Sequence, residues 1–491
     1  MAPWPTNPIV YEINSHLWLA ELARKYGRPI TLQEVPVEEF ARFEEFHLDA
    51  IWLMGVWTPS PAGRRIALRY AKTFREALPD LKKEDVIASP FAVYDYSVDP
   101  ALGGEEGLKL FRERLHKRGI RLMLDFISNH MAVDHPWTVS HPERLFQGSI
   151  KGFEREPELY FLRRVGQKNY IFAHGRDPNF PPWTDTVQID YSSPETRAAM
   201  VEILEKIAAL ADGARCDMAM LITGPVFQRT WRLRGPIVEF WPEAISRVKA
   251  RRPDFIFLGE VYWGLERELQ KQGFDFVYDK TLYDRLLCSE PEAVRAHLRA
   301  CLPFQSRLAR FIENHDERRA LDAFGPEKSK AAAAVIATLP GLRLFHEGQF
   351  EGRRVHVPVQ LQRRPEEEIQ KDVEDFYRRL LGLASGEAFR RGAWILLGAC
   401  PAEDSDPTWR NLLTCAWQYE GKTHLVAVNL GRESSRARVS LPAPGFERER
   451  LGAQTLMSTE EKNQPELRFH LEFEVELEPY GVRIFNVGSA R

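Results

Sequence analysis

The stretch Asp212-Gly213-Ala214-Arg215-Cys216-Asp217-Met218-Ala219-Met220 decides how the fold of this chain is interpreted. It is an apolar run that carries a cation and a carboxylate two residues apart. Alternate residues of a β-strand point to the same face, so Arg215 and Asp217 would share a face. A guanidinium beside a carboxylate keeps the acid ionised and orients it, although an ordinary structural ion pair at a strand end has the same local pattern.

Strands and helices alternate on both sides of this stretch. A helix is expected over residues 194–210, directly before it. The other expected strands cover residues 9–13, 49–54, 121–126, 255–261, 274–278, 308–313 and 342–345. Near-continuous apolar strands separated by helices are typical of a parallel sheet covered by helices. Eight strands in this alternation fit a (β/α)8 TIM barrel better than an open sheet.

The alternation is interrupted once and ends before the C-terminus. Residues 131–186 are rich in His, Pro, aromatic and charged residues with little periodicity, so we expect an irregular insert after the third strand. From about residue 395 the pattern has period two, which predicts a C-terminal antiparallel β-sandwich; its clearest run is Phe469, Leu471, Phe473, Val475 and Leu477. The expected domains are the barrel (1–130 and 187–390), the insert (131–186) and the C-terminal β domain (395–491).

Composition narrows the classes of partner. The 491 residues include 67 basic and 70 acidic ones, for a net charge of -3. This balance predicts no nucleic-acid or membrane partner and suits a neutral substrate. Neither a secretory signal nor a membrane span is expected, and the oligomeric state stays open. Scattered cysteines without CxxC spacing are expected to be reduced thiols of a cytoplasmic protein; they are Cys216, Cys288, Cys301, Cys400 and Cys415.

Polar clusters follow four of the predicted strands. In a TIM barrel the catalytic groups lie at the C-terminal ends of the strands. A single carboxylate there is usually a helix cap or part of a salt bridge, but four clusters at one end indicate a functional site. The clusters are Asp125-Phe126-Ile127-Ser128-Asn129-His130, then Arg215 with Asp217, then Gly259-Glu260-Val261-Tyr262-Trp263, and finally Glu313-Asn314-His315-Asp316-Glu317-Arg318.

With these clusters in this order, the chain resembles the alpha-amylase family, glycoside hydrolase family 13. The clusters match that family's four short motifs, and the resemblance spans the barrel, the insert and the C-terminal domain. It implies that Asp217 is the nucleophile, Glu260 the general acid/base and Asp316 the transition-state stabiliser. Arg215 would orient Asp217. The other implied site residues are Asp125 and Asn129 as structural support and Phe91, His130, Trp263 and His315 as substrate-binding residues.

The chemistry of retaining glycoside cleavage needs these residue types. One ionised carboxylate attacks the anomeric carbon while one protonated acid releases the leaving oxygen, with the pair about 5–5.5 Å apart. Arg215 would keep Asp217 ionised, and burial would raise the pKa of Glu260. We therefore expect a retaining hydrolase that acts on α-glucosidic bonds of α-glucans or maltooligosaccharides in carbohydrate metabolism, through a covalent glucosyl-aspartate intermediate.

Three departures from the family pattern bear on specificity. Phe91 stands where a stacking tyrosine is usual before Asp95-Tyr96. Met220-Leu221 stands where many amylases carry a Lys-His pair on the acceptor side, and Ala214 replaces a larger residue before Arg215. Because the first two leave the outcome of the reaction open, a transglycosidase or isomerase of the glucanotransferase, trehalose or sucrose type is the alternative. A non-catalytic barrel used for assembly is a third reading.

No cofactor is expected. The resemblance leaves a structural calcium site open, but the missing Lys-His pair and the lack of a carboxylate-rich loop do not support one. A zinc site at His130, His135 and His141 fits less well than sugar binding, because no helical HxxxH spacing or cysteine partner is present. The aromatic and proline-rich insert further predicts a lid that favours short, soluble α-glucosides over polymeric starch.

Overall fold

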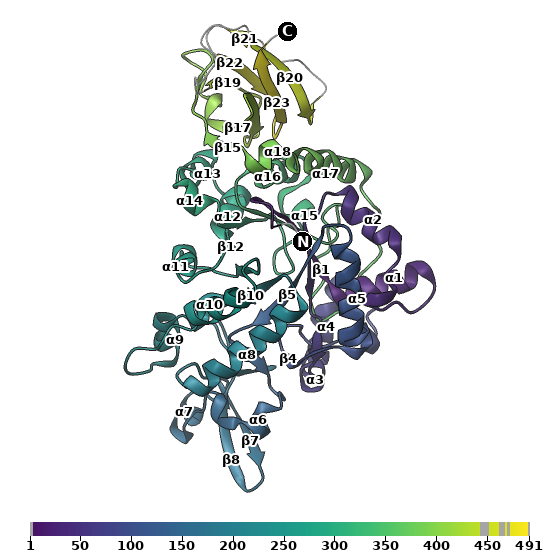
Figure 1. Cartoon of the computed structure of the whole chain (residues 1–491), viewed down its shortest axis with the longest axis vertical. Coiled ribbons are helices and arrows are strands. Elements are labelled where there is room, and N and C mark those ends of the chain that lie inside the picture. Colours follow the sequence, from purple (N-terminus) through teal and green to yellow (C-terminus); the bar gives the residue numbers. More distant parts are fainter. Residues whose placement is uncertain (1–2, 442–450, 461–466, 469–471, 490–491) are drawn as a thin grey trace.

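The computed structural model describes residues 3–441, 451–460, 467–468 and 472–489. At its centre, parallel strands close a barrel in the order β1-β14-β13-β12-β11-β10-β5-β2 (Figure 1). This confirms the predicted (β/α)8 barrel. The barrel strands are β1 (Ile9–Asn14), β2 (Ala50–Met54), β5 (Arg121–Ile127), β10 (Gly213–Asp217), β11 (Ile256–Gly259), β12 (Phe276–Tyr278), β13 (Leu308–Arg310) and β14 (Leu342–His346).

The barrel strands are short, apolar and almost completely buried. All residues of β1, β2, β5 and β10 are buried. A few polar residues interrupt these apolar runs, among them Glu12 on β1, Asp125 on β5 and Arg215 on β10. The register places Arg215 opposite Asp125. A charge inside such a strand is costly unless it is paired, so these residues mark the functional interior.

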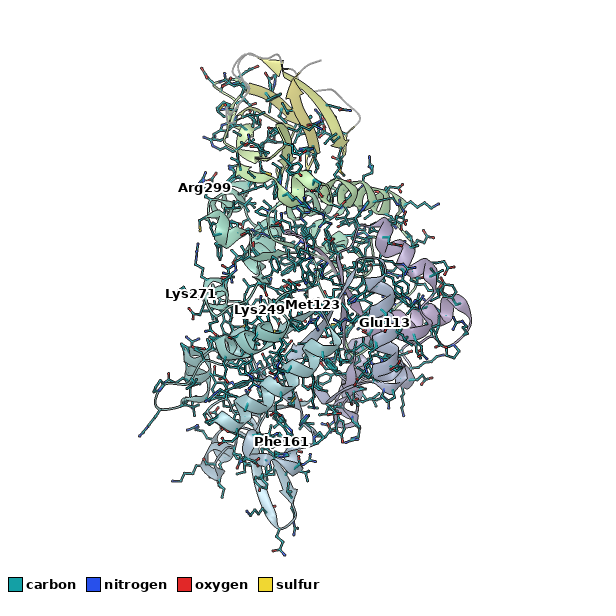
Figure 2. All side chains as sticks on the ribbon, in the orientation of Figure 1. Glu113, Met123, Phe161, Lys249, Lys271 and Arg299 are labelled. Atoms are coloured by element: carbon teal, nitrogen blue, oxygen red, sulfur yellow. The ribbon has the colours of Figure 1, made fainter. Side chains whose placement is uncertain are left out.

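Helices cover the outside of the barrel. In α5 the buried residues Gly107, Leu108, Phe111 and Leu115 share one face. Met123 of β5 is fully buried and lies near the middle of the view in Figure 2, whereas Lys271 of α11 lies at its left edge. No helix in the described ranges is both long and apolar enough to cross a membrane. The helices around the barrel are α1 (Ser15–Tyr26), α2 (Val37–Glu45), α5 (Gly104–His116), α8 (Pro194–Leu210), α9 (Gly224–Trp231), α10 (Trp241–Arg251), α11 (Glu266–Lys271), α12 (Lys280–Cys288), α13 (Pro291–Leu298), α14 (Leu302–Gln305), α15 (Ala320–Phe324), α16 (Pro326–Thr338), α17 (Lys371–Ala384) and α18 (Glu387–Arg391).

The insert after β5 is more regular than its sequence indicates. It contains the ribbon β6 (His130–Ala132) with β9 (Thr186–Gln188), the hairpin β7 (Tyr160–Val165) with β8 (Lys168–Ala173), and the helices α6 (Trp137–Ser140) and α7 (Ile150–Arg155). The hairpin extends away from the barrel (Figure 1). Its strands are only partly buried, so they lack the apolar alternation that identifies a strand in sequence.

A second elaboration follows β2. It comprises β3 (Trp57–Pro59), α3 (Pro61–Ala67), α4 (Ala71–Ala77) and β4 (Val93–Val98). The chain after α4 meets the segment after β14 in a contact that we call the clasp, formed by residues 80–87 and 360–363. An antiparallel bridge joins Val86 to Leu361, and Arg363 pairs with Asp80 and Asp85.

The C-terminal domain lies at the end of the molecule opposite the β7–β8 hairpin (Figure 1). One sheet has the order β15-β17-β18-β23-β20 and the other β16-β19-β22-β21. Apolar side chains of both sheets form a common core, which confirms the predicted antiparallel β domain. Phe469 and Leu471 lie outside the described residues. The strands are β15 (Ala393–Leu396), β16 (Ala399–Pro401), β17 (Leu412–Tyr419), β18 (Lys422–Asn429), β19 (Ser435–Ser440), β20 (Leu451–Ser458), β21 (Leu467–Arg468), β22 (Glu472–Leu477) and β23 (Val482–Ser489).

Candidate active site

The polar clusters meet at the carboxyl ends of the barrel strands. Asp217 is the last residue of β10, and Glu260 directly follows β11. Met218 has a left-handed backbone with φ of 43°, which ends the strand immediately after Asp217. This turn aims the Met218 amide at Glu260 Oε2, 2.7 Å away. A non-glycine residue in this conformation is a strained position of the kind that clusters at functional sites.

Arg215 joins the two carboxylates. Its Nη1 donates to Asp217 Oδ1 at 2.6 Å and its Nη2 donates to Glu260 Oε2 at 2.7 Å. The guanidinium is fully buried, and the Tyr278 hydroxyl lies 3.4 Å from its Nε. Because a guanidinium stays charged, it fixes the positions of both carboxylates and provides positive charge between them.

Burial sets the acidity of this pair. It raises the pKa of Glu260 to about 7, with Arg215 acting against the shift and the charge of Asp217 adding to it. Glu260 Oε1 also accepts a hydrogen bond from the Tyr262 hydroxyl at 2.7 Å. Burial raises the pKa of Asp217 as well, and Arg215 opposes that increase. The sequence-based argument foresaw the effect of Arg215 but not that burial would outweigh it at Asp217.

Asp125 lies behind this pair and supports it indirectly. Its carboxylate is fully buried and accepts hydrogen bonds from Trp52 Nε1 and the Gly55 amide, each at 3.0 Å. The Trp52 ring in turn lies 5.2 Å from Cζ of Arg215. Burial raises the pKa of Asp125 to about 7. Asp125 thus holds the aromatic surface on which the guanidinium rests.

His315 and Asp316 form a second group of charges. His315 Nε2 lies 3.1 Å from Asp316 Oδ2, while Nδ1 contacts Glu12 Oε1. Burial favours neutral His315, but Asp316 and Glu12 raise its pKa well above the ordinary value. The surrounding protein disfavours ionised Asp316, although its side chain is half exposed, yet His315 holds the pKa of Asp316 well below its usual range. The ring of Phe91 stacks on His315 at 5.0 Å.

His130 lies at the start of the insert. Burial lowers its pKa to about 4, so its imidazole is neutral near pH 7. The Asn129 side-chain amide lies 3.3 Å from His130 Nδ1, and Gln188 Nε2 donates to Asn129 Oδ1 at 3.1 Å. The ring of Trp183 packs 5.0 Å from His130. The insert therefore fixes His130 from two sides.

Three other residues singled out in the sequence lie on the segments after β10 and β11. Trp263 is 40% exposed, with φ of 63°, on the loop after β11. Met220 and Leu221 are 0% and 2% exposed in the short 3-10 helix after β10, so neither forms an open wall beside Asp217. This corrects the expectation that the pair lines the acceptor side. Apolar side chains at this position pack into the core, whereas a charged or polar pair could not.

The histidines considered for zinc do not converge. His135 Nδ1 accepts a hydrogen bond from the Trp137 amide at 3.1 Å, and His141 Nδ1 lies 2.9 Å from Ser140 Oγ. Within residues 3–441, 451–460, 467–468 and 472–489, no three His, Cys, Asp or Glu residues form a group that could hold a metal ion.

The sequence argument missed several groups that contact the site. Glu12 and Tyr278 come from barrel strands that carried no motif, and His356 Nε2 donates to the His315 carbonyl at 2.8 Å from the segment after β14. Glu12 had a visible signal, since a carboxylate inside the apolar stretch Ile9–Asn14 is rarely buried without a partner. Tyr278 and His356 had none, because their positions depend on barrel closure and on the course of a loop.

Comparison with known proteins identifies the family. A family model described as the alpha-amylase catalytic domain matches residues 45–380, which is more than half of the chain. The chain belongs to the alpha-amylase family. An alpha-amylase of Haloarcula japonica is 25% identical over 71% of this chain and 48% of its own length. This alpha-amylase family member thus matches about half of that relative.

Two further comparisons bear on reaction type and fold. A 4-alpha-glucanotransferase of Thermotoga maritima is 24% identical over 53% of this family member and 59% of its own length. A crystal structure of a maltogenic alpha-amylase from Thermotoga neapolitana superposes with a TM-score of 0.68 at 18% identity, covering 98% of both chains. The latter likeness shows a shared fold.

Proposed function

We propose that this alpha-amylase family member is a retaining glycoside hydrolase that cleaves α-glucosidic bonds of α-glucans or maltooligosaccharides. The observation that carries the proposal is the buried Arg215 guanidinium, which binds Asp217 and Glu260 at 2.6 and 2.7 Å. Because Arg215 contacts both Asp217 and Glu260, one of the two carboxylates can stay ionised while the other is protonated. The carboxylate that stays ionised attacks, and the one whose pKa approaches neutrality donates a proton.

In the first step, protonated Glu260 gives its proton to the glycosidic oxygen. Asp217 attacks the anomeric carbon with Oδ2, because Oδ1 is engaged by Arg215. The carbon–oxygen bond to the leaving sugar breaks as an ester bond to Asp217 forms. The leaving sugar departs as a neutral alcohol, and Glu260 is left ionised beside Arg215.

In the second step, ionised Glu260 removes a proton from water. The resulting hydroxide attacks the anomeric carbon, the ester bond breaks and Asp217 is released as a carboxylate. Glu260 regains its proton and the anomeric configuration is retained. The pKa of Glu260, raised to about 7 by burial, suits a group that must both donate and accept a proton near neutrality.

The remaining groups are suited to hold the sugar ring. Asp316, half exposed at its side chain, offers carboxylate oxygens beside the His315 imidazole, so hydroxyls can both donate and accept there. Neutral His130 provides a second imidazole on the insert side. The half-buried Phe91 ring offers an apolar face for the sugar, in line with the preference of sugar rings for aromatic surfaces.

The experiment combines two variants with analysis of the product. Asp217→Asn and Glu260→Gln should each abolish turnover of maltooligosaccharides. Glu260→Gln should keep activity on an aryl α-glucoside with a good leaving group, because that substrate needs little acid assistance. NMR of the first product formed should show the α-anomer. Near-native activity of Asp217→Asn, or a β-anomer product, would overturn the proposal.

Transglycosylation on the same site is the second candidate. Met220 and Leu221 are apolar and packed into the core, so these two positions offer no charged or imidazole group to an acceptor sugar. A glucanotransferase among the relatives is consistent with sugar replacing water as the acceptor. Chromatography of products from maltotriose decides between them: longer maltooligosaccharides indicate transfer, whereas glucose and maltose alone indicate hydrolysis. Sugar binding without any turnover would instead favour a non-catalytic barrel.

A further inference from the structure

Glu12 is a buried carboxylate that none of the proposed steps uses. It lies on β1, is fully buried, and pairs in register with Trp52 of β2 and His346 of β14. Its Oε1 contacts His315 Nδ1, although the two residues are 303 positions apart. Its Oε2 has no hydrogen-bond partner among the described residues. Burying a carboxylate costs free energy unless it is paired, and His315 is the partner that Glu12 has.

The contacts of His315 define its protonation state. Each ring nitrogen faces a carboxylate oxygen, Nδ1 that of Glu12 and Nε2 that of Asp316. A carboxylate at each ring nitrogen favours the doubly protonated ring. Burial acts against it, but Asp316 and Glu12 raise the pKa of His315 well above its ordinary value. Phe91 stacks on one face of the ring at 5.0 Å, an arrangement that favours a cation.

The geometry at Nε2 leaves its proton available to a substrate. Asp316 Oδ2 lies 3.1 Å from Nε2, within ion-pair distance, but the contact is poorly aligned for a hydrogen bond. A sugar hydroxyl that is better aligned with the His315 Nε2–H can therefore accept its hydrogen bond in place of Asp316. A sugar hydroxyl could accept from Nε2 while another donates to Asp316, and a charged donor makes the stronger hydrogen bond.

We propose that Glu12 is a positioning residue that holds His315 as an imidazolium directed at Asp316, so that β1 supplies the charge on which sugar binding at this pair depends. The inference rests on the proposed glycosidase function. Glu12 and Asp316 are the groups that touch the ring nitrogens. Other titratable or charged groups facing His315 and Asp316 are Asp125 on β5, Arg215 and Asp217 on β10, Glu260 and Tyr262 after β11, His346 on β14 and His356 in the following segment.

Glu12→Gln tests the charge while keeping the size of the side chain. In the wild type, ¹⁵N NMR of histidine-labelled enzyme should show both His315 nitrogens protonated up to pH 8, with the signal assigned from a His315→Gln variant. In Glu12→Gln, burial and Asp316 still act on His315 in opposite directions, so its pKa should fall toward the ordinary histidine value of about 6.5. A wild-type His315 that loses a proton between pH 6 and 7, or one whose titration is unchanged by Glu12→Gln, would overturn the proposal.

Kinetics provides an independent readout. At each pH, kcat/KM of Glu12→Gln is divided by that of the wild type. This division removes the pH dependence that both enzymes share through Glu260. This ratio should be near one at pH 5 and fall about tenfold by pH 7.5, because a group of ordinary pKa loses its proton over that range. Glu39→Gln is the control, since Glu39 is also buried but bonds Lys25 and Tyr26 on the outside of the barrel.

The outcomes separate this inference from the proposed function. If the kcat/KM ratio stays constant with pH, Glu12 has only a structural role. The kcat/KM ratio of Glu12→Ala should then also be constant with pH. A wild type that turns over no α-glucoside defeats the proposed function. In that case the NMR titration alone still decides whether Glu12 sets the charge of His315.

Discussion

Phe91 places its ring beside two charged groups. It lies 5.0 Å from the His315 ring and 5.2 Å from Arg215 Cζ. Phe91→Tyr should change kcat/KM little, because the aromatic face remains. Phe91→Ala should lower it at least about fivefold, since an aromatic contact is worth about 1 kcal/mol or more. Phe180→Ala, at a 64% exposed position on the insert, is the control. Equal, small losses in both Phe91 variants would show that the ring does not hold the sugar.

Glu260 should set the alkaline limit of activity. Burial raises its pKa to about 7, and the acid role needs the protonated form. As the pH rises through 7 the protonated fraction falls, so kcat/KM should fall about tenfold for each further pH unit. With an α-glucosyl fluoride, whose leaving group needs little protonation, this fall in kcat/KM at high pH should disappear. A pH profile that is flat from 6 to 9 on maltooligosaccharides would contradict the acid assignment.

The clasp is the element that connects two loops to the site. Ile87 donates a backbone hydrogen bond to Gln360 at 2.8 Å, and the fully buried Leu361 packs in a small apolar cluster with Phe74, Leu78 and Val86. Phe91 follows one half of the clasp, and His356, which bonds the His315 carbonyl, precedes the other. The clasp is therefore placed to hold Phe91 and His356 against His315.

Leu361→Ala should lower kcat/KM several-fold as well as stability. Removing a buried leucine side chain costs about 2–5 kcal/mol, and here the cavity would loosen the support of Phe91 and His356. Leu412→Ala is the matched control, because Leu412 is equally buried but lies in the C-terminal sandwich. Calorimetry should show destabilisation in both variants, with kcat/KM reduced only in Leu361→Ala. Equal kcat/KM values for Leu361→Ala and Leu412→Ala would rule out a role for the clasp in positioning the site.

The sequence predicts those elements whose pattern is local. Eight buried strands appear as apolar runs, and the two-residue spacing of Arg215 and Asp217 places both on one face. Contacts that depend on closure of the barrel have no local signal. His315, which follows β13, meets Glu12 of β1 only because closure of the barrel places both strands beside β14. The clasp forms between two loops distant in sequence. Burial of Met220 and Leu221 likewise depends on how the chain turns after β10.

At the scale of the whole molecule, the insert and the segment that leads into the clasp each contact the site. Trp183 of the insert packs on His130, and His356, which precedes the clasp, donates a hydrogen bond to the His315 carbonyl. If these two segments close over the bound sugar, they favour a small substrate from which water is excluded. We expect kcat/KM to level off within the first few glucose units of a series from maltose to amylose. A value that keeps rising beyond about six or seven units, with internal cleavage products, would indicate an open groove instead.

The measurement that tests the central claim most directly is capture of the covalent intermediate on Asp217. A 5-fluoro-α-glucosyl fluoride forms the ester but hydrolyses slowly, because fluorine disfavours the oxocarbenium-like transition state. Intact mass spectrometry of the wild type should show one added fluoroglucosyl group, and peptide mapping should locate it on Asp217. Asp217→Asn should acquire none. Steady turnover of the compound without an adduct, or an adduct on a residue other than Asp217, would contradict the account.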